Sequence, residues 1–196
     1  MIAKINPKGR GRPRGFDVDA ALGTAQALFH EHGYDAVGVA AITEALGINP
    51  PSFYAAFGSK AGLFEQVLER YSACALPLED ILAPGRPPAE ALAELLEAAA
   101  RFYAADPHTT GCLVLESARA SGDPHSAAKA QALKSASRDH VRAFVARTHA
   151  GMADLVADYV VSMMSGLSAG AREGWSAERL GAVARMSAPL LAAMLA

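Results

Sequence analysis

The chain of 196 residues is long enough for one ordinary domain, or for a small domain beside a larger one. With 52% hydrophobic, 19% charged and 7% aromatic residues, its composition favours a helix-rich globular protein over a disordered or fibrous one. The net charge of −2 hides an asymmetry, because residues 1–15 hold five of the 18 basic residues and no acid, which leaves 13 basic against 20 acidic residues elsewhere.

The sequence shows no pattern typical of membrane insertion, secretion or a disulfide framework. Its longest uncharged apolar stretch, residues 159–171, is shorter than the roughly 20 residues that cross a bilayer. The N-terminus lacks the apolar core of a secretion signal, so we expect a cytoplasmic protein with no membrane partner. Cys74 and Cys112 are too few for a disulfide framework, and the six histidines have no metal-ligand spacing, so we expect no metal and no cofactor.

The first feature along the chain is a basic flexible arm over residues 1–15. Its run Gly-Arg-Gly-Arg-Pro-Arg, which contains Arg10, Arg12 and Arg14, is similar to the Gly-Arg-Pro core of AT-hook peptides. In such peptides the arginines follow the negative potential of narrow A·T-rich minor grooves. The alternative is a solvated tail that adds only non-specific attraction to phosphates.

After the arm, apolar residues repeat with a helical period, and no useful length alternates as a half-buried strand does. Asp17 can cap a first helix that ends at residue 32, before Gly33. Further helices are expected over residues 39–46, 51–57, 59–75, 89–105, 110–121, 126–149, 153–172 and 177–195, with a proline-rich connector over 77–88. The fold class is therefore all-α.

Two short helices joined by a tight turn at residues 47–49 predict a helix-turn-helix. Ala40 and Ala41 keep the first helix slim, so that the second can cross it closely. Gly47 can take the left-handed conformation that the turn needs, and Ile48 can fill the angle between the helices. Two small helices around a glycine are a weak signal when no other information is used.

The residues of this segment resemble the DNA-binding domain of the tetracycline-repressor (TetR) family. The match covers about residues 15–70 and rests on Gly33-Tyr34, Ile42, Leu46-Gly47-Ile48, Phe53-Tyr54, Phe57, Ser59-Lys60 and Leu63-Phe64. The remainder resembles the family only in length, helix number and a C-terminal pattern, and it identifies no ligand. The resemblance implies a helix-turn-helix domain over residues 16–60, a connecting helix over 61–76 and a ligand-binding and dimerisation domain over 77–196.

The resemblance also implies a homodimer that places the helix over residues 51–57 in the major groove, at half-sites roughly 34 to 36 Å or more apart. Tyr54 and Lys60 would contact phosphates, whereas Asn49, Pro50, Pro51 and Ser52 would approach base edges. The chain departs from the family at two positions. Gly38 stands where a Thr or Ser is usual, and Thr43 stands where Ala is usual and could supply a substitute phosphate contact.

The implied ligand pocket lies among the helices between residues 89 and 172. Its candidate lining residues are Phe102, Tyr103, Cys112, Leu115, Glu116, Phe144, Tyr159 and Met163, and ordinary core or surface packing is the alternative for each. Cys112 could sense electrophiles or oxidants if a helix N-terminus lowered the pKa of its thiol. A buried, unreactive cysteine is the alternative.

Apolar stripes on the last two expected helices suggest the dimer interface. The stripes contain Val160, Met164 and Leu167 on the first helix and Val183, Met186, Leu190 and Met194 on the second. Paired across a two-fold axis, they would form a four-helix bundle. Burial within a single subunit explains each stripe about as well, so the dimer assignment depends on the resemblance.

Together these features predict a sequence-specific transcriptional regulator, a repressor that binds a palindromic operator as a dimer and is released by an unidentified small-molecule effector. One alternative is an architectural DNA-binding protein without a sensor, although more than 100 residues beyond the helix-turn-helix exceed what that needs. The other is a helical enzyme. The sequence contains neither a phosphate-binding glycine loop nor a Gly-x-Ser-x-Gly elbow, so we expect no enzymatic activity.

Overall fold

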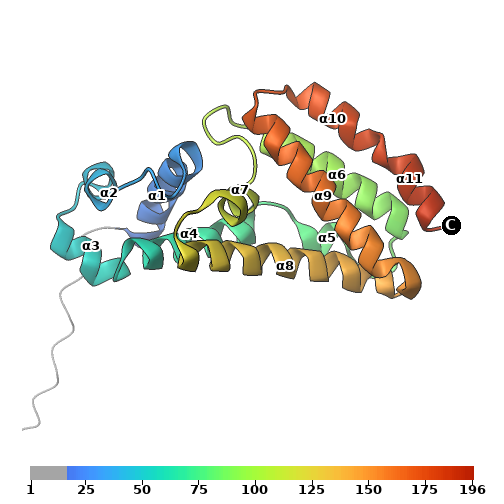
Figure 1. The fold of residues 1–196 in the computed structure, drawn as a ribbon, viewed down its shortest axis with the longest axis horizontal. Helices are drawn as coiled ribbons and strands as arrows, with labels where there is room; N and C mark the ends of the chain where they lie inside the picture. The colour runs from blue at the N-terminus through green and yellow to red at the C-terminus, as the bar shows by residue number, and fades with distance from the viewer. Residues whose placement is uncertain (1–16) are drawn as a thin grey trace, which may run out of the picture.

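The computed structural model describes residues 17–196, and helices are the only regular elements among them (Figure 1). This confirms the all-α prediction. The elements are α1 (Val18–His32), α2 (Val39–Leu46), α3 (Pro50–Phe57), α4 (Lys60–Cys74), α5 (Leu78–Ile81), α6 (Pro88–Tyr103), α7 (Leu113–Ala120), α8 (Pro124–Ala146), a 3₁₀ turn (Ala150–Met152), α9 (Ala153–Arg172), α10 (Ala177–Arg185) and α11 (Ser187–Met194). The basic arm, with Arg10, Arg12 and Arg14, lies outside the described residues.

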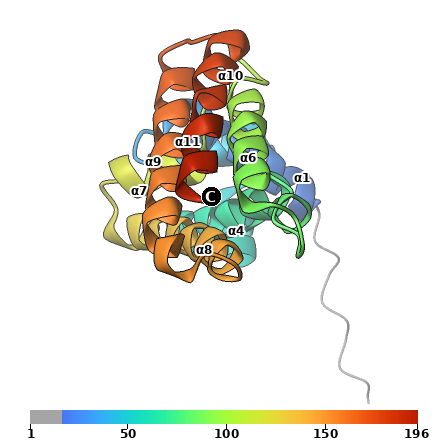
Figure 2. The ribbon, with the colours of Figure 1, turned by 90° about the vertical axis from the view of Figure 1, so that its right-hand side faces the viewer.

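The molecule is elongated, with α1, α2 and α3 at one end and the C-terminal helices at the other (Figure 1). The helices α4 and α8 run along one side. Seen from the C-terminal end, α6, α9 and α11 stand side by side (Figure 2). No helix over residues 17–196 has the length and hydropathy required to cross a bilayer.

The first and fourth helices each begin at a side-chain cap, and Asp17 is the cap that the sequence predicts for the first. The Asp17 carboxylate accepts a hydrogen bond from the backbone N–H of Asp19 at 2.9 Å, and the Ser59 hydroxyl accepts one from the N–H of Gly62 at 2.9 Å. Each bond satisfies a backbone donor that a helix start leaves without an intrahelical partner. These caps fix where α1 and α4 begin, on either side of the helix-turn-helix.

The structure differs from the prediction in the last expected helix, which is divided into α10 and α11 at Met186. Pro189 is the reason, because it has no N–H to donate to the carbonyl of Arg185 and its ring would clash with that carbonyl. The expected connector over residues 77–88 also contains one helical turn, α5.

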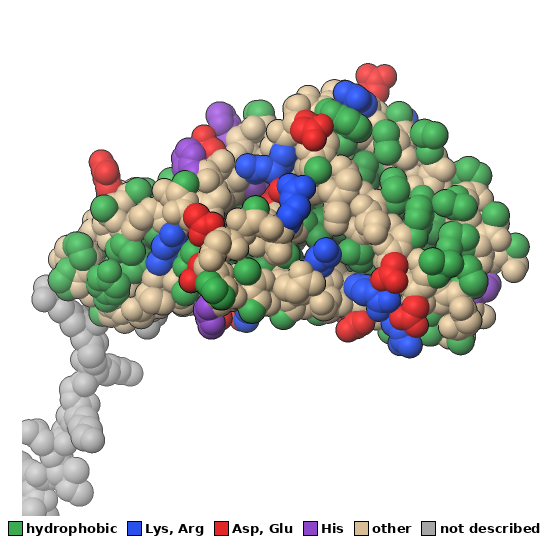
Figure 3. All heavy atoms as spheres, viewed as in Figure 1, with side chains coloured by type: hydrophobic (Ala, Val, Ile, Leu, Met, Phe, Trp, Pro, Cys, Tyr) green, Lys and Arg blue, Asp and Glu red, His purple; other side chains and the backbone are tan. Residues whose placement is uncertain are grey.

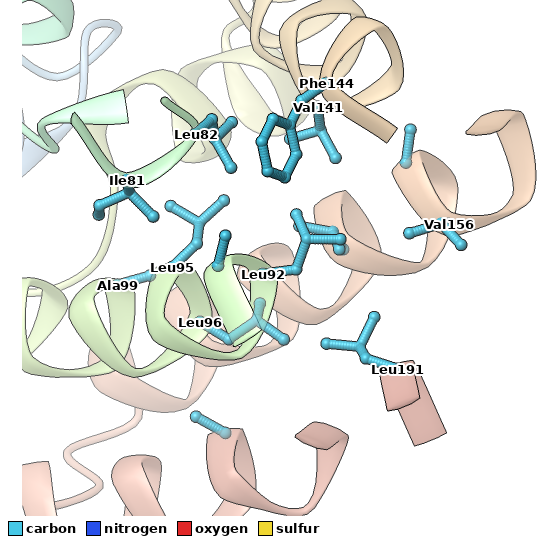
Figure 4. Packing of buried hydrophobic residues seen from close by; sticks show 14 of the residues in the cluster. Ile81, Leu82, Leu92, Leu95, Leu96, Ala99, Val141, Phe144, Val156 and Leu191 are labelled. Carbon is cyan, nitrogen blue, oxygen red and sulfur yellow. The ribbon is translucent and has the colours of Figure 1, made fainter. Parts of the chain in front are cut away.

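Two apolar clusters hold the helices together. The larger cluster joins α5, α6 and α8 to α11, and Leu92, Leu95, Phe144 and Leu191 lie within it (Figure 4). The second is built around the helix-turn-helix. It also includes residues of the C-terminal half, namely Leu113 and Val114 of α7 and Ala130 of α8. The DNA-binding end therefore shares its core with two helices of the C-terminal domain.

The loop before α7 packs tightly on α9 at Gly111, which has a φ of 81°. A Cβ at this position would lie 2.9 Å from Cγ of Arg172 and 3.1 Å from the backbone oxygen of Ser168. Gly33 has a similar φ of 80°, but a Cβ there would meet nothing within 4 Å. Replacing either glycine would therefore strain the backbone, but only a side chain at position 111 would also crowd neighbouring atoms.

We expect Gly111→Ala to destabilise the protein more than Gly33→Ala. Both substitutions force a residue with a Cβ into the left-handed region, which costs about 1 to 2 kcal/mol. Gly111→Ala adds overpacking, which costs about 1 to 3 kcal/mol more. Thermal unfolding of the two variants measures the difference, and equal melting temperatures would contradict the tight packing.

Candidate DNA interface and ligand cavity

The turn between α2 and α3 has the geometry of a helix-turn-helix. Gly47 adopts the left-handed conformation, with φ 62° and ψ 30°, as its position predicts. The N–H of Ile48 donates to the carbonyl of Thr43 at 3.0 Å and closes the end of α2. The side-chain oxygen of Asn49 then accepts from the N–H of Ser52 at 2.9 Å and caps α3. Because its oxygen is occupied, Asn49 has its amide N–H donors left for another partner.

The helix α3 has one buried and one exposed face. Phe53 and Phe57 are buried against the domain core, with ring centroids 5.6 Å apart. Pro50, Pro51 and Tyr54 are exposed, and the Tyr54 side chain keeps 51% of its surface accessible. An exposed aromatic residue next to a fully buried one defines the outer surface of the helix.

Thr43 does not fit the phosphate contact that its position suggests. Its side chain is buried, and its hydroxyl donates to the carbonyl of Ala40 within the same helix at 2.9 Å. A hydroxyl held in this way is not directed at solvent. Gly38, at the start of α2, provides no side-chain cap, so neither position where the chain departs from the family offers a free hydroxyl.

Lys60 is the first residue of α4 and lies over an aromatic ring. Its Nζ is 4.0 Å from the centroid of Tyr34, a cation–π distance. Burial lowers the pKa of the Lys60 ammonium, and the carboxylates of Asp35 and Asp123 act in the opposite direction. The ammonium therefore lies over the loop that joins α1 to α2, in a partly shielded position.

The comparisons with known proteins agree with this geometry. A family model described as bacterial regulatory proteins, tetR family, matches residues 21–67. The HTH-type transcriptional repressor BdcR of Escherichia coli (strain K12) is 45% identical over 196 residues, covering 100% of this chain and 99% of BdcR. The chain belongs to the tetR family of bacterial regulatory proteins. It is a DNA-binding regulator and not an enzyme.

Other known proteins match over most of the chain. The repressor ComR of Escherichia coli (strain K12) is 33% identical over 186 residues, which cover 88% of each chain. Two solved structures of cysteine mutants of the regulator CifR, each complexed with 26-bp double-strand operator DNA, are 35% identical to this chain. They cover 91% of this chain and 98% of CifR, with TM-scores of 0.78 and 0.80.

A cavity of about 80 Å³ lies among the helices that follow the helix-turn-helix. Residues from α4 to α9 line it: Tyr71, Ser72, Ala75, Leu76, Leu78, Leu95, Tyr103, Cys112, Val114, Leu115, Lys134, Ser137, Val141, Val161 and Met164. Three of the expected pocket residues, Tyr103, Cys112 and Leu115, are among them. Neither Tyr71 nor Lys134 was expected, and Tyr71 shows in the sequence only as part of the buried stripe of its helix.

The other expected pocket residues lie elsewhere. Phe102 packs on the ring of Tyr71, and Phe144 and Met163 belong to the larger apolar cluster. Glu116 accepts a hydrogen bond from the Ser168 hydroxyl at 2.9 Å. Tyr159 donates from its hydroxyl to Ser187 of α11 at 2.9 Å. None of these five residues lines this cavity, but Glu116 lines a second cavity of about 280 Å³ between α1 and α7.

Cys112 lies at the start of α7, but its surroundings oppose the reactive thiol considered from the sequence. Burial raises the pKa of this thiol, and hydrogen bonds from backbone N–H groups, together with the nearby hydroxyls of Tyr71 and Tyr103, only partly offset that effect. A raised pKa leaves less of the nucleophilic thiolate at neutral pH.

No group of three His, Cys, Asp or Glu residues over 17–196 is placed to hold a metal ion.

The expected dimer residues divide into two groups. Val160 and Leu167 are buried within the subunit, Met164 lines the cavity, and Val183 and Met194 pack on the larger cluster. Only Met186 and Leu190 are well exposed, at 75% and 46%, together with Leu155 of α9, which was not expected. Hydrophobic side chains cover much of the C-terminal end (Figure 3). The expected stripe on α9 was therefore largely its inward face.

Proposed function

We propose that this chain is a repressor that binds a palindromic operator as a homodimer and is released when a small molecule occupies the cavity. The observation that supports release is the position of the cavity, which shares walls with the helix-turn-helix core. Val114 of α7 both lines the cavity and belongs to the cluster around the helix-turn-helix. Tyr71 of α4 does the same.

The exposed face of α3 is the part of the chain that we assign to the DNA major groove. Asn49, Pro50, Pro51 and Ser52 would approach base edges, and Tyr54 would contact a phosphate. Prolines cannot donate hydrogen bonds, so base discrimination would depend on Asn49, Ser52 and apolar contacts. Because α3 has few groups that can hydrogen-bond to bases, Arg10, Arg12 and Arg14 of the arm would contribute to DNA binding.

The dimer would form through the exposed apolar residues of α9, α10 and α11. Leu155 and Leu190 are large hydrophobic side chains that the subunit leaves accessible, as is Met186 at the junction of α10 and α11. A two-fold axis through this face would pair each residue group with its copy and complete a four-helix bundle.

A ligand can release the protein from its operator only if it binds more tightly to one of two arrangements of the helix-turn-helix. The two halves of the chain are joined by specific contacts. The N–H of Gly122 donates to the Asp35 carboxylate at 2.7 Å, and Arg172 donates to the carbonyl of His30 at 2.9 Å. A ligand that moved α4 or α7 would therefore carry the helix-turn-helix with it and change the spacing of the two α3 helices in the dimer.

The proposed phosphate contact of Lys60 has a salt-dependent signature. We expect Lys60→Gln to weaken operator binding and to reduce the slope of log K against log salt by about 0.9 per subunit, since one fewer counterion is released. Fluorescence anisotropy at several salt concentrations measures this slope. Lys129→Gln is the matched control, because Lys129 pairs with Glu69 at 2.7 Å on α4. An unchanged slope for Lys60→Gln would show that Lys60 does not contact a DNA phosphate.

Selection from random double-stranded DNA at about physiological salt tests the proposed function, because non-specific attraction is weak there. We expect enrichment of a palindrome whose half-sites face the same side of the duplex. Failure of a monodisperse protein to enrich any sequence would contradict the proposal. Binding to DNA without enrichment would favour the architectural alternative.

A further inference from the structure

The polar groups of the cavity are unevenly placed. Most of its wall is apolar, formed by residues such as Leu95, Val141, Val161 and Met164. At one side, the hydroxyls of Tyr71 and Tyr103 are buried without a hydrogen-bond partner of ordinary geometry, and both interact with the thiol of Cys112. These hydroxyls are covered by other atoms, so they close the cavity and do not offer it a free donor.

The accessible polar groups come from α4 and α8, which pack against each other. They are Ser72, which is exposed, and Lys134 and Ser137, which are half-buried. The Ser137 hydroxyl donates to the carbonyl of Leu133 at 3.1 Å, so its proton is occupied. Among the side chains that line the cavity, Lys134 is therefore the one that can offer a strong donor.

Lys134 is the one charged residue that lines the cavity, and it forms no ion pair with any of residues 17–196. Nearby lysines and arginines of the same helix behave differently. Lys129 pairs with Glu69, and Arg138 pairs with Asp154 and Asp158 of α9. An unpaired ammonium beside an apolar wall attracts anions and disfavours cations.

From this arrangement we propose that the cavity binds a small hydrophobic carboxylate, with its apolar part against Leu95, Val141 and Met164 and its carboxylate at the Lys134 ammonium. A cavity of about 80 Å³ has room for about three water molecules, at the roughly 30 Å³ that each occupies in the liquid, which suits the short alkyl chain of an acid whose carboxylate lies at the half-buried Lys134. The inference rests on the proposed function, in that this carboxylate would be the releasing effector.

Three probes that differ in charge test the proposal without DNA. Hexanoate carries the carboxylate, hexanamide is its neutral isostere, and hexylammonium reverses the charge. Calorimetric titration of the full chain should show hexanoate binding about 3- to 10-fold more tightly than hexanamide, the range expected of a charge-assisted contact at a partly exposed site. Hexylammonium should bind most weakly.

Two lysine variants on α8 test whether Lys134 causes the preference for hexanoate over hexanamide. Lys134→Met keeps the aliphatic stem and should abolish the difference between hexanoate and hexanamide, while hexanamide binding stays within about 2-fold. Lys129→Met, on the same helix and outside the cavity lining, should leave the difference intact. The proposal would be overturned if hexanamide bound as well as hexanoate, since Lys134 would then only extend its stem along the apolar wall towards water.

DNA binding separates this inference from the proposed function. If the chain selects a palindrome but prefers no carboxylate, the inference fails and the function stands. If hexanoate binds as described but does not weaken operator binding, the carboxylate site stands and release by this ligand fails. If no probe binds, the inference is wrong whatever the DNA experiment shows.

Discussion

The Leu190→Glu variant should be a monomer that binds operator DNA roughly 100-fold or more weakly than the parent chain. Leu190 is 46% exposed on α11, and Met186, one turn before it, is 75% exposed. In the proposed dimer, two copies of the introduced carboxylate would be buried near each other at the two-fold axis, where unpaired charge is strongly unfavourable. Loss of the second subunit removes the avidity of two linked DNA-binding ends, which is commonly worth 10²- to 10⁴-fold.

Analytical ultracentrifugation and anisotropy with the selected operator measure these two effects. Ala143→Glu is a control that adds the same charge at an exposed position of α8. It should leave both mass and affinity unchanged. A Leu190→Glu protein that remained dimeric would place the interface on another face of the molecule.

Replacing the neighbouring residues Phe53 and Tyr54 by alanine should affect two different properties, stability for Phe53 and operator affinity for Tyr54. Phe53 is fully buried, so Phe53→Ala should cost about 3 to 5 kcal/mol of stability, a large share of the 5 to 15 kcal/mol available to a typical domain. Tyr54 is 51% exposed, so Tyr54→Ala should change the free energy of unfolding little. Its loss should appear in operator affinity, because the phosphate contact assigned to it disappears.

Denaturant unfolding and operator titration of both variants separate the two roles. Phe53→Leu serves as a control, because it retains most of the apolar volume and should recover much of the lost stability. If Tyr54→Ala bound operator as well as the parent chain at matched stability, the exposed face of α3 would not be the DNA contact surface.

Local structure could be predicted well from the sequence. Caps at Asp17 and Ser59, the left-handed Gly47 and the buried positions of Phe53 and Phe57 all follow from residue type and near neighbours. Each depends on interactions within a few residues, which periodicity and capping rules describe.

Assignments that depend on packing between distant helices were less successful. On α9 only Asp154 and Asp158 mark a charged face near its start, and the rest of its surface carries apolar or small residues, so the sequence does not show that Val160 and Leu167 point inward while Leu155 points outward. Similarly, Lys134 lies on a helix with many polar residues, and only the packing of α4 against α8 places it at the cavity. The intrahelical bond of Thr43 was equally hidden, because a hydroxyl can turn either to solvent or to a preceding carbonyl.

The most direct test of the central claim is operator affinity after base pairs are inserted at the centre of the selected palindrome. Two α3 helices held at a fixed separation require both half-sites on one side of the duplex, and five extra base pairs rotate one half-site by about half a helical turn. We predict that this insertion lowers affinity roughly 100-fold, close to the affinity for one half-site. Undiminished binding would show that the two half-sites are recognised independently and would contradict the account of a rigid dimer.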